Sequence, residues 1–418
     1  MPTPNDLIKR LSDDNTPRLI RLHGKKQLSF DKSKKLFVGH GAVEGLIPIT
    51  RPCAVIDGSD AVVEVTVKDC VTNDTALFSL EPSAENVEIR NLRLIVRIEN
   101  TKNSTNTFSV IHSVAQGLKL YNCHIDVFSD KQISLIGIDN NGNRNTHLNT
   151  LADNMVVSDC RITLTCLPEA IELPCTVCGI RNRLANSISV ENSFVQVTNR
   201  GTGEAQKAIG IDTDGRFGRF VGNNIKANAT HNEGLLKEQG LAIGFLNNGM
   251  YSLISSNNLV GEWAGKSIGL DSSGRYADIT GNKILATHTI CGRSLRLYGE
   301  GSIVNGNIIT STSRNARLIE LASNGCVICN NVMEVLLGSD ACQSGVGIYA
   351  VGENISDNTI TGNIIRNVRN VGILADPKRN RLDGNQILSS NETRKIVDLT
   401  DKKLIALLDE TGIQSIIY

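Results

Sequence analysis

A short phrase recurs along the chain and restricts its fold more than any other feature. It reads ITGNKI at residues 279–284, VNGNII at 304–309 and ICNNVM at 328–333. In each copy an Asn, or a residue that replaces it, stands two places before Leu, Ile, Phe or Val. The aligned positions, 23 to 37 residues apart, are Leu92, Cys123, Cys160, Asn192, Asn223, Asn257, Asn282, Asn307, Asn330, Asn358 and Asn385.

A second phrase alternates with the first. It is Gly-Ile-Asp or a variant of it, as in Gly210-Ile211-Asp212 and Gly269-Leu270-Asp271. Both phrases are short, rich in β-branched residues and alternate with a period of two, which predicts strands. Amphipathic helices of a helical solenoid are missing, and a propeller blade would need four strands and a longer period.

Two strand phrases per turn, repeated in register, predict an all-β fold, a right-handed parallel β-helix. We expect about 11–12 coils over residues 51–390, with like positions stacked at roughly 4.8 Å. Residues 1–50 are expected to form an N-terminal cap with the first strands, and 391–418 a C-terminal cap. Short amphipathic patterns predict a helix in each cap.

An Asn at an inward-facing bend must satisfy its amide in a dry interior. Stacked Asn residues can do so by bonding to one another and to the backbone of the next coil. We therefore expect an asparagine ladder inside the helix, with Cys123 and Cys160 filling the same position in the earlier coils.

The two phrases resemble the right-handed parallel β-helices of the pectate-lyase-like superfamily, over roughly residues 50–390. That resemblance implies the fold. It also implies a function among those of the superfamily, which includes polysaccharide lyases, glycoside hydrolases, uronate epimerases, phage tailspikes and non-enzymatic adhesins. The fold does not choose among these classes. The motifs of polygalacturonase-like hydrolases and alginate epimerases do not appear on successive coils: "DTDG" at 212–215 is only loosely similar.

The second phrase suggests where a ligand would lie. Its central Ile points inward, so alternation would place both flanking residues outside. The Gly column would then form a smooth trough for an extended polymer or for a second protomer; it runs Gly137, Gly179, Gly210, Gly244, Gly269, Arg296, Glu320, Gly347 and Gly372. The neighbouring column would carry side chains, in the order Asp139, Arg181, Asp212, Leu246, Asp271, Tyr298, Ala322, Tyr349 and Leu374.

Carboxylates beside such a trough are candidates for acid and base. Asp212 and Asp271 would lie two coils apart, about 9–10 Å, and Asp212 and Asp214 about 7 Å apart along one strand. Both separations suit inverting glycoside hydrolysis, for which the carboxyl groups stand roughly 6.5–9.5 Å apart. With Arg181 these three aspartates are the predicted catalytic residues. The alternative is a surface ladder Asp139–Arg181–Asp212 that pairs charges in solvent for little energy.

The predicted substrate-binding residues supply charge and aromatic faces for sugars; they are Asp139, Tyr298, Tyr349, Arg296, Glu320 and His231. We predict no cofactor, although a lyase would need Ca²⁺. The Cys-x-x-Cys pairs 175/178 and 326/329 are expected to be packed thiols rather than zinc ligands, because residues three apart on a strand face opposite sides.

The leading hypothesis is a polysaccharide lyase or hydrolase, and the alternative is a non-catalytic module that binds glycan or protein. The 43 basic and 43 acidic residues cancel, which argues against nucleic acid and membrane partners. The partner is expected to be a polysaccharide, and the chain a monomer or a homo-oligomer joined through the trough. The N-terminal residues do not resemble a signal peptide, so we expect cytoplasmic synthesis, with export by another route or with a phage particle.

Overall fold

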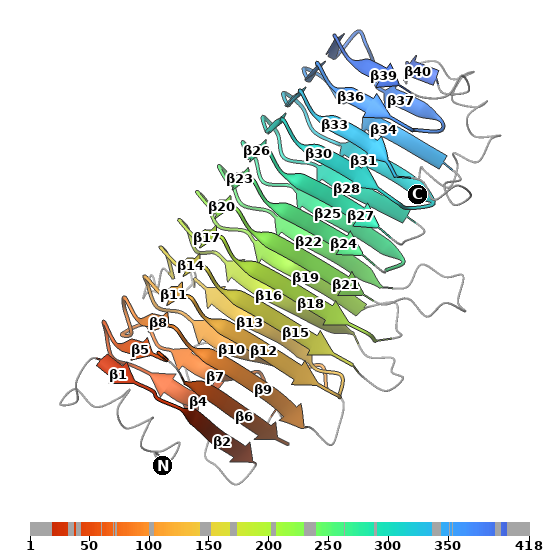
Figure 1. Ribbon diagram of the computed structural model, residues 1–418. Coiled ribbons are helices and arrows are strands. Elements are labelled where there is room, and N and C mark those ends of the chain that lie inside the picture. Colours follow the sequence, from red (N-terminus) through yellow and green to blue (C-terminus); the bar gives the residue numbers. More distant parts are fainter. Residues whose placement is uncertain are drawn as a thin grey trace.

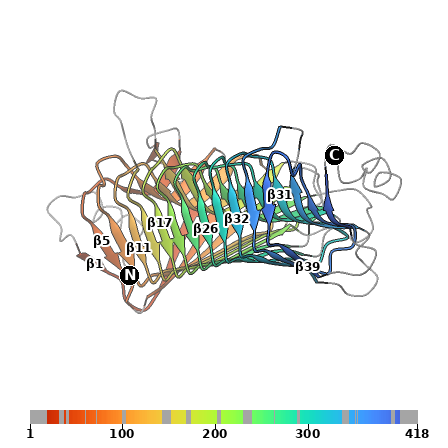
Figure 2. The ribbon, with the colours of Figure 1, turned by 90° about the horizontal axis from the view of Figure 1, so that it is seen from above.

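Three long parallel sheets wind together into a β-helix (Figure 1). The computed structural model describes residues 19–31, 37–38, 43–59, 61–69, 71, 73–99, 104–142, 152–167, 174–201, 206–229, 240–262, 264–287, 291–336, 344–350, 352, 354–388 and 394–398. Each coil contributes one strand to sheet A, one to sheet B and one to sheet C, and the first coil adds an extra strand to sheet C. Like positions of successive coils therefore stack along the axis (Figure 2).

Sheet A has 13 short strands: β1 (Leu19–Arg21), β5 (Val55–Asp57), β8 (Glu88–Arg90), β11 (Lys119–Tyr121), β14 (Val156–Ser158), β17 (Ser189–Glu191), β20 (Arg219–Val221), β23 (Leu253–Ser255), β26 (Asp278–Thr280), β29 (Ile303–Asn305), β32 (Val327–Cys329), β35 (Thr359–Thr361) and β38 (Arg381–Asp383). Sheet B follows it in each coil, also with 13 strands: β2 (Lys25–Asp31), β6 (Val62–Lys68), β9 (Arg93–Glu99), β12 (His124–Ser129), β15 (Arg161–Cys166), β18 (Phe194–Asn199), β21 (Asn224–Ala229), β24 (Asn258–Glu262), β27 (Lys283–Thr287), β30 (Ile308–Ser311), β33 (Val332–Val335), β36 (Ile364–Arg366) and β39 (Gln386–Leu388).

Sheet C has 14 strands: β3 (Phe37–Val38), β4 (Glu44–Ile49), β7 (Thr75–Leu80), β10 (Thr107–Ser113), β13 (Ser134–Asn141), β16 (Cys175–Arg183), β19 (Gln206–Thr213), β22 (Leu241–Asn247), β25 (Lys266–Ser272), β28 (Cys291–Leu297), β31 (Asn315–Leu321), β34 (Ser344–Ala350), β37 (Val371–Leu374) and β40 (Arg394–Val397). Only the β3–β4 pairing is antiparallel among the strand pairs described.

The predicted all-β parallel β-helix is confirmed, with 13 strands in sheets A and B rather than 11–12 coils. The difference arises at the ends. β1 pairs with β5 and β2 with β6, so the first coil already forms within the residues expected to be a cap. At the other end, residues 394–397 form β40 beside β37, where a helix was expected. The other residues of both predicted helices lie outside the described residues.

The core is the apolar interior enclosed by the three sheets. Its largest fully buried side chains include Phe30, Phe108, Phe220 and Phe245, and the rings of Phe220 and Phe245 meet edge to face at 4.6 Å. Few residues of this chain are aromatic, so the interior is filled mainly by Ile, Val and Leu. The described part of the chain contains no helix with the length and apolar character of a membrane span.

The asparagine ladder is present at the bend from sheet A to sheet B. Each side-chain amide before the last member donates to the Oδ1 of the next coil at 2.9–3.0 Å, and its second hydrogen goes to a backbone carbonyl. The same Oδ1 accepts from the backbone N–H one coil back. The members are Asn223, Asn257, Asn282, Asn307, Asn331, Asn363 and Asn385, with Ser193, Cys160, Cys123 and Leu92 in the earlier coils.

Three predicted members of the ladder were wrong. Asn192 and Asn330 lie one residue before the ladder position, in left-handed backbone with φ of 48° and 55°. Ser193 and Asn331 take the buried place instead. Asn358 belongs to a different bend, where it bonds to Asn380 at 2.9 Å, and Asn363 is the ladder residue of that coil. In the Asn-Ser and Asn-Asn pairs, both residues stand close before an apolar residue. The sequence pattern alone therefore does not show which residue of the pair takes the ladder position.

The Gly column does not form a surface, so the predicted trough of glycines is wrong. A Cβ at Gly137, Gly269 or Gly347 would run into Cγ2 of a core Ile on sheet B. The glycines therefore face inward. Strand pairing is interrupted at the row of glycines, and sheet C bends there. In a regular strand one residue would separate two inward-facing side chains, but here two residues separate the inward-facing Leu135 and Ile138. An assembly of protomers through a glycine trough is excluded by the same geometry.

The ladder assignment predicts opposite outcomes at neighbouring residues. Asn331→Ala removes the bonds to Asn363, Val304 and Asn307 and leaves buried donors and acceptors unpaired, so we expect a loss of about 3 kcal/mol or more in the free energy of unfolding. Asn330→Gly should change it by less than about 0.5 kcal/mol, since Gly adopts left-handed backbone freely. Urea unfolding followed by circular dichroism measures both; equal losses would contradict the assignment.

The inward Gly column predicts a cost for any side chain. In Gly210→Ala the new methyl group would overlap Cγ2 of Ile225 and the carbonyl oxygen of Gly244, which should destabilise the fold by roughly 1–3 kcal/mol. Lys207→Ala, at an exposed position of the same strand, is the control and should be nearly neutral. A neutral Gly210→Ala in urea unfolding would show that the column faces solvent.

Candidate functional site

A column of polar side chains runs along the outer face of sheet C, three residues after the apolar row of Ile136. Strand register places these residues in direct succession, one per coil: His112, Asp139, Arg181, Asp212, Leu246, Asp271, Arg296, Glu320, Tyr349 and Leu374. Tyr298 and Ala322 were predicted for two of these places. Arg296 and Glu320 occupy them instead, because in those coils the inward anchors are Leu295 and Ile319 rather than a residue of the Gly phrase.

Asp139 is the most enclosed carboxylate of the column. Arg181 donates to it with two guanidinium nitrogens, both at 2.8 Å, and Nδ1 of His112 lies 3.0 Å from its Oδ2. Burial alone would raise the pKa of Asp139, but the bonds from His112 and Arg181 outweigh it and lower that pKa to about 2. The side chains of Asp139 and His112 are only 4% and 2% exposed, so this is not a pair in solvent.

Asp212 is held differently. Arg183, two residues beyond Arg181 on β16, donates to its Oδ2 at 2.5 Å, while its Oδ1 is buried and has no hydrogen-bond partner among the described residues. Burial raises the pKa of Asp212, and Arg183 and Arg181 offset this only in part. Asp214 accepts from the backbone N–H of Leu184 and lies 3.6 Å from Arg183, so it positions that arginine.

A second cluster surrounds Glu320. Arg293 and Arg317 both donate to its Oε2, at 2.6 and 2.5 Å, and the hydroxyl of Tyr298 donates to its Oε1 at 2.5 Å. Burial would raise the pKa of Glu320, but these positive charges and the hydroxyl lower it. Glu320 is therefore a saturated acceptor that organises its neighbours. The rings of Tyr298 and Tyr349 support the guanidinium groups of Arg296 and Arg317 at 4.7 and 4.8 Å.

Asp271 is linked to the Glu320 cluster through Arg296, which lies near both carboxylates. Arg296 donates to its Oδ2 at 3.0 Å, and no other hydrogen bond to it is made by the described residues. Burial raises the pKa of Asp271; Arg296 opposes the effect and Glu320 adds to it. Asp212 and Asp271 are separated by Leu246 alone, so they lie two coils apart as the sequence predicted, about 9–10 Å between their backbones.

A groove of about 340 Å³ lies beside Asp212. Apolar side chains form its floor and three cations stand around it; the lining residues are Thr107, Ser134, Ile136, Thr176, Cys178, Arg181, Arg183, Lys207, Ile209, Asp212 and Leu246. The floor is a stripe of buried residues on the outer face that continues to Ile243 and Ile268. A surface with apolar floor and charged edges suits a sugar chain, whose rings have apolar faces and polar rims.

Most of the predicted site residues are brought together on this face, in two groups around Asp212 and Glu320. His231 lies outside the described residues. Sequence reasoning missed His112, Arg183, Arg293 and Arg317. His112 follows from extending the strand phrase one coil back, through Val110 and Ile111, and the two later arginines follow from anchoring their coils at Leu295 and Ile319.

The described residues do not offer a metal centre: no group of three or more His, Cys, Asp or Glu among them is arranged to hold an ion. Both oxygens of Asp139 are already engaged by His112 and Arg181, which also removes Arg181 from the role of a free base. Cys175 packs in the core while Cys178 lies on the outer stripe, so this Cys-x-x-Cys pair faces opposite sides.

No family model and no curated protein matches this chain. Solved structures do. The tailspike protein of E. coli bacteriophage HK620, in complex with a pentasaccharide, aligns with 95% of this chain and 76% of its own at a TM-score of 0.52 and 11% identity. The Dettilon tailspike protein aligns at 0.41 and 14%, over 81% of this chain. The A-module of a mannuronan C-5 epimerase from Azotobacter vinelandii aligns at 0.31 and 11%, over 90% of both chains.

This chain spans 62% of the Dettilon tailspike chain, which is less than two thirds of it. The likeness to the HK620 tailspike establishes the parallel β-helix fold and agrees with the resemblance read from the two repeated phrases.

The enclosed Asp139 predicts acid sensitivity. Because its pKa is lowered from 3.8 to about 2, its ionised form stabilises the fold above pH 4, and this contribution is lost as the pH falls from about 4 to 2. The shift corresponds to about 2 kcal/mol. Asp139→Asn should be less stable at pH 7 and should lose this part of the pH dependence. Urea midpoints from pH 2 to 7 test it; an unchanged dependence in the variant would contradict the assignment.

Proposed function

We propose that this protein binds a polysaccharide along the outer face of sheet C and hydrolyses it, with Asp271 as general acid and Asp212 as general base. One observation carries the proposal. Two largely buried carboxyl groups stand two coils apart on the outer face of sheet C, and one of them, Asp212, lines the groove. Each has one oxygen held by an arginine and no hydrogen bond to the other oxygen from the described residues.

The surroundings of the two carboxyl groups divide the roles. Asp212 has both Arg183 and Arg181 nearby, which favour its ionised form. Asp271 also lies near two arginines, Arg296 and Arg293, but the negative charge of Glu320, which favours the protonated form, acts on it more strongly than Arg293 does. In the reaction Asp212 takes a proton from water as the water attacks the anomeric carbon, and Asp271 gives its proton to the departing glycosidic oxygen. Their separation leaves room for that water, so inversion is expected.

The groove favours an acidic polysaccharide. Arg181 and Arg183 point their charge to the groove beside an exposed Lys207, while Ile136 and Ile209 supply an apolar floor. Guanidinium groups bind carboxylates in a fixed geometry, and the apolar floor accepts a ring face. The HK620 tailspike was solved with a pentasaccharide, and its fold is shared here, which supports a glycan ligand and a phage-associated place of action.

A non-catalytic glycan-binding module is the second candidate. The observation that favours it is the saturation of Asp139 and Glu320, whose oxygens are already taken by arginine, histidine or tyrosine. Such pairs present ordered cations and hydroxyls to a ligand without supplying an acid or a base. In that case Asp212 and Asp271 would accept hydrogen bonds from sugar hydroxyls.

The experiment is a screen of acidic and neutral polysaccharides for new reducing ends and for absorbance at 235 nm, with and without a chelator. We expect new reducing ends without absorbance, and no effect of the chelator. Asp212→Asn and Asp271→Asn should each lower kcat at least 100-fold, since a positioned acid or base contributes about 10²–10⁴. Asp278→Asn, on sheet A of the same coil and exposed, is the matched control.

Other results would assign the protein elsewhere. Unsaturated products that depend on calcium would make it a lyase and overturn the hydrolase assignment. Binding of a polysaccharide without any product, weakened by both aspartate variants, would establish the binding module.

A further inference from the structure

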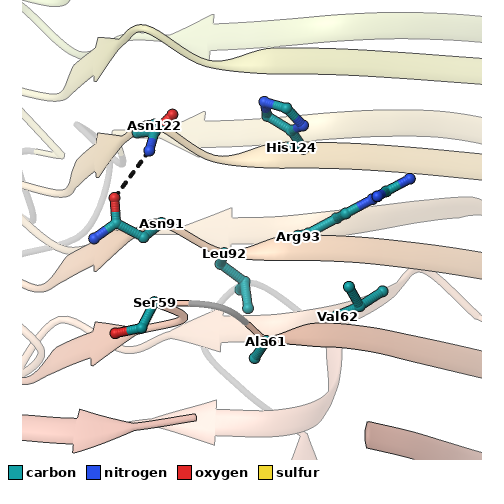
Figure 3. A pocket seen from close by; sticks show the side chains of 8 residues that line it. All are labelled: Ser59, Ala61, Val62, Asn91, Leu92, Arg93, Asn122 and His124. Atoms are coloured by element: carbon teal, nitrogen blue, oxygen red, sulfur yellow. Dashed lines mark hydrogen bonds between the residues drawn. The ribbon is translucent and has the colours of Figure 1, made fainter. Parts of the chain in front are cut away.

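A row of basic side chains, two arginines and a histidine, lies on a different face, at the start of three successive strands of sheet B. His124 pairs with Arg93 on one side and with Arg161 on the other, so the three side chains project in the same direction, about 4.8 Å apart. All three are exposed. Figure 3 shows Arg93 and His124 reaching out from neighbouring coils on the same side.

Several basic side chains elsewhere on the molecule are paired with carboxylates, unlike this row. Lys25 pairs with Glu64, Lys226 with Glu262, and Arg219 with Glu191. Arg93 and His124 make no ion pair with any described residue, and Arg161 lies over the ring of Phe194 at 4.7 Å. Asp126, half-buried two residues beyond His124, makes no ion pair with the row among the described residues either.

Like charges stacked along one face of a sheet repel one another and weaken the sheet. At Lys25, Lys226 and Arg219 a carboxylate offsets the charge. The row therefore carries a cost that the described part of the fold does not offset, and a ligand with negative charges at matching intervals would offset it.

A cavity of about 260 Å³ adjoins the row at the bend between sheets A and B. It is lined by Ser59, Ala61, Val62, Asn91, Leu92, Arg93, Asn122 and His124 (Figure 3). Asn122 donates to Asn91 at 3.0 Å, so the two amides place polar groups along the outer edge of the cavity. Ala61, Val62 and Leu92 form an apolar wall. The amides can bond to sugar hydroxyls, the apolar wall can contact a ring face, and the basic side chains can bind acid groups. Together these features match a sugar acid.

We propose that the cavity and the Arg93–His124–Arg161 row form a second binding site, separate from sheet C, for an acidic polysaccharide that carries carboxylate or sulfate groups. One sugar lies in the cavity between Asn122 and Arg93, and the following acid groups lie over His124 and Arg161, along the helix axis. The whole chain is electrically neutral, so the attraction is local to this row, unlike the broad basic surface of a nucleic-acid-binding protein.

The test uses the full chain in the Asp212→Asn background, so that ligand is not consumed, with calorimetry at low salt. The probes are tetragalacturonate for carboxylates and a heparin octasaccharide for sulfates, and the stronger binder identifies the acid group. The triple variant R93Q/H124Q/R161Q should bind that probe at least tenfold more weakly. Arg219→Gln, a surface cation that is already paired with Glu191, should bind as the parent does.

The same series contains the results that would overturn the inference. Loss of binding in Lys207→Gln but not in the triple variant would place all acid recognition on sheet C, leaving the proposed function intact and this site refuted. Equal affinity for single-stranded DNA of the same charge, lost in the triple variant, would mark an unspecific or nucleic-acid surface. Equal affinity for inorganic sulfate alone would mean an adventitious ion only.

Folding of the triple variant supplies an independent readout. Removing the two arginine charges should keep or raise Tm, because their mutual repulsion is relieved. A lower Tm with unchanged binding would show that these side chains serve the fold and would overturn the proposal. Hydrolysis on sheet C, measured in the triple variant with Asp212 restored, should stay at the wild-type rate, and this separates failure of the second site from failure of the first.

Discussion

The structure depends on the register between successive coils, and the asparagine ladder is the interaction that sets it most strictly. Each ladder amide bonds to the amide one coil away and to the backbone on both sides, in an interior where no water is available to replace a lost bond. A slip of one residue would break these bonds and move every following side chain to the other face of its sheet. The columns on the outer faces are consequences of this register.

Burial explains how the outer face of sheet C is arranged. Charged side chains are packed along the apolar stripe of Ile136 and its successors, and the carboxylates among them are largely removed from water. A charge in such a place is stable only with a partner, which accounts for the close pairs of Asp139 and Glu320 with arginine. Asp212 and Asp271 are the exceptions, since each keeps one oxygen without a hydrogen bond from the described residues. That departure from full pairing is where chemistry or ligand binding is expected.

Much of this fold could be predicted because the spacing of a sequence repeat follows the spacing of the coils that it forms. Two phrases in alternation predicted parallel coils, and the Asp212–Asp271 relation followed from counting coils. The errors came where neighbouring residues are chemically alike or where a phrase fades. Asn330 and Asn331 cannot be told apart without knowing which one has left-handed backbone. In the coils of Arg296 and Glu320 the glycine is absent, and the alignment slipped by two residues until strand pairing corrected it.

The amino-acid sequence by itself determined the solenoid, the inward Asn row and the succession of charged residues on one strand of each coil. This is because equivalent positions stack directly on one another, so each coil needs the same kind of residue at the same position as the coil before it. Only the tertiary structure decided which face the glycines take, since the bend in sheet C breaks the alternation on which sequence reasoning relies. It also decided which carboxylates are neutralised. Arg183, Arg293 and Arg317 reach their partners across coils, and such contacts depend on side-chain direction and burial that a linear pattern does not contain.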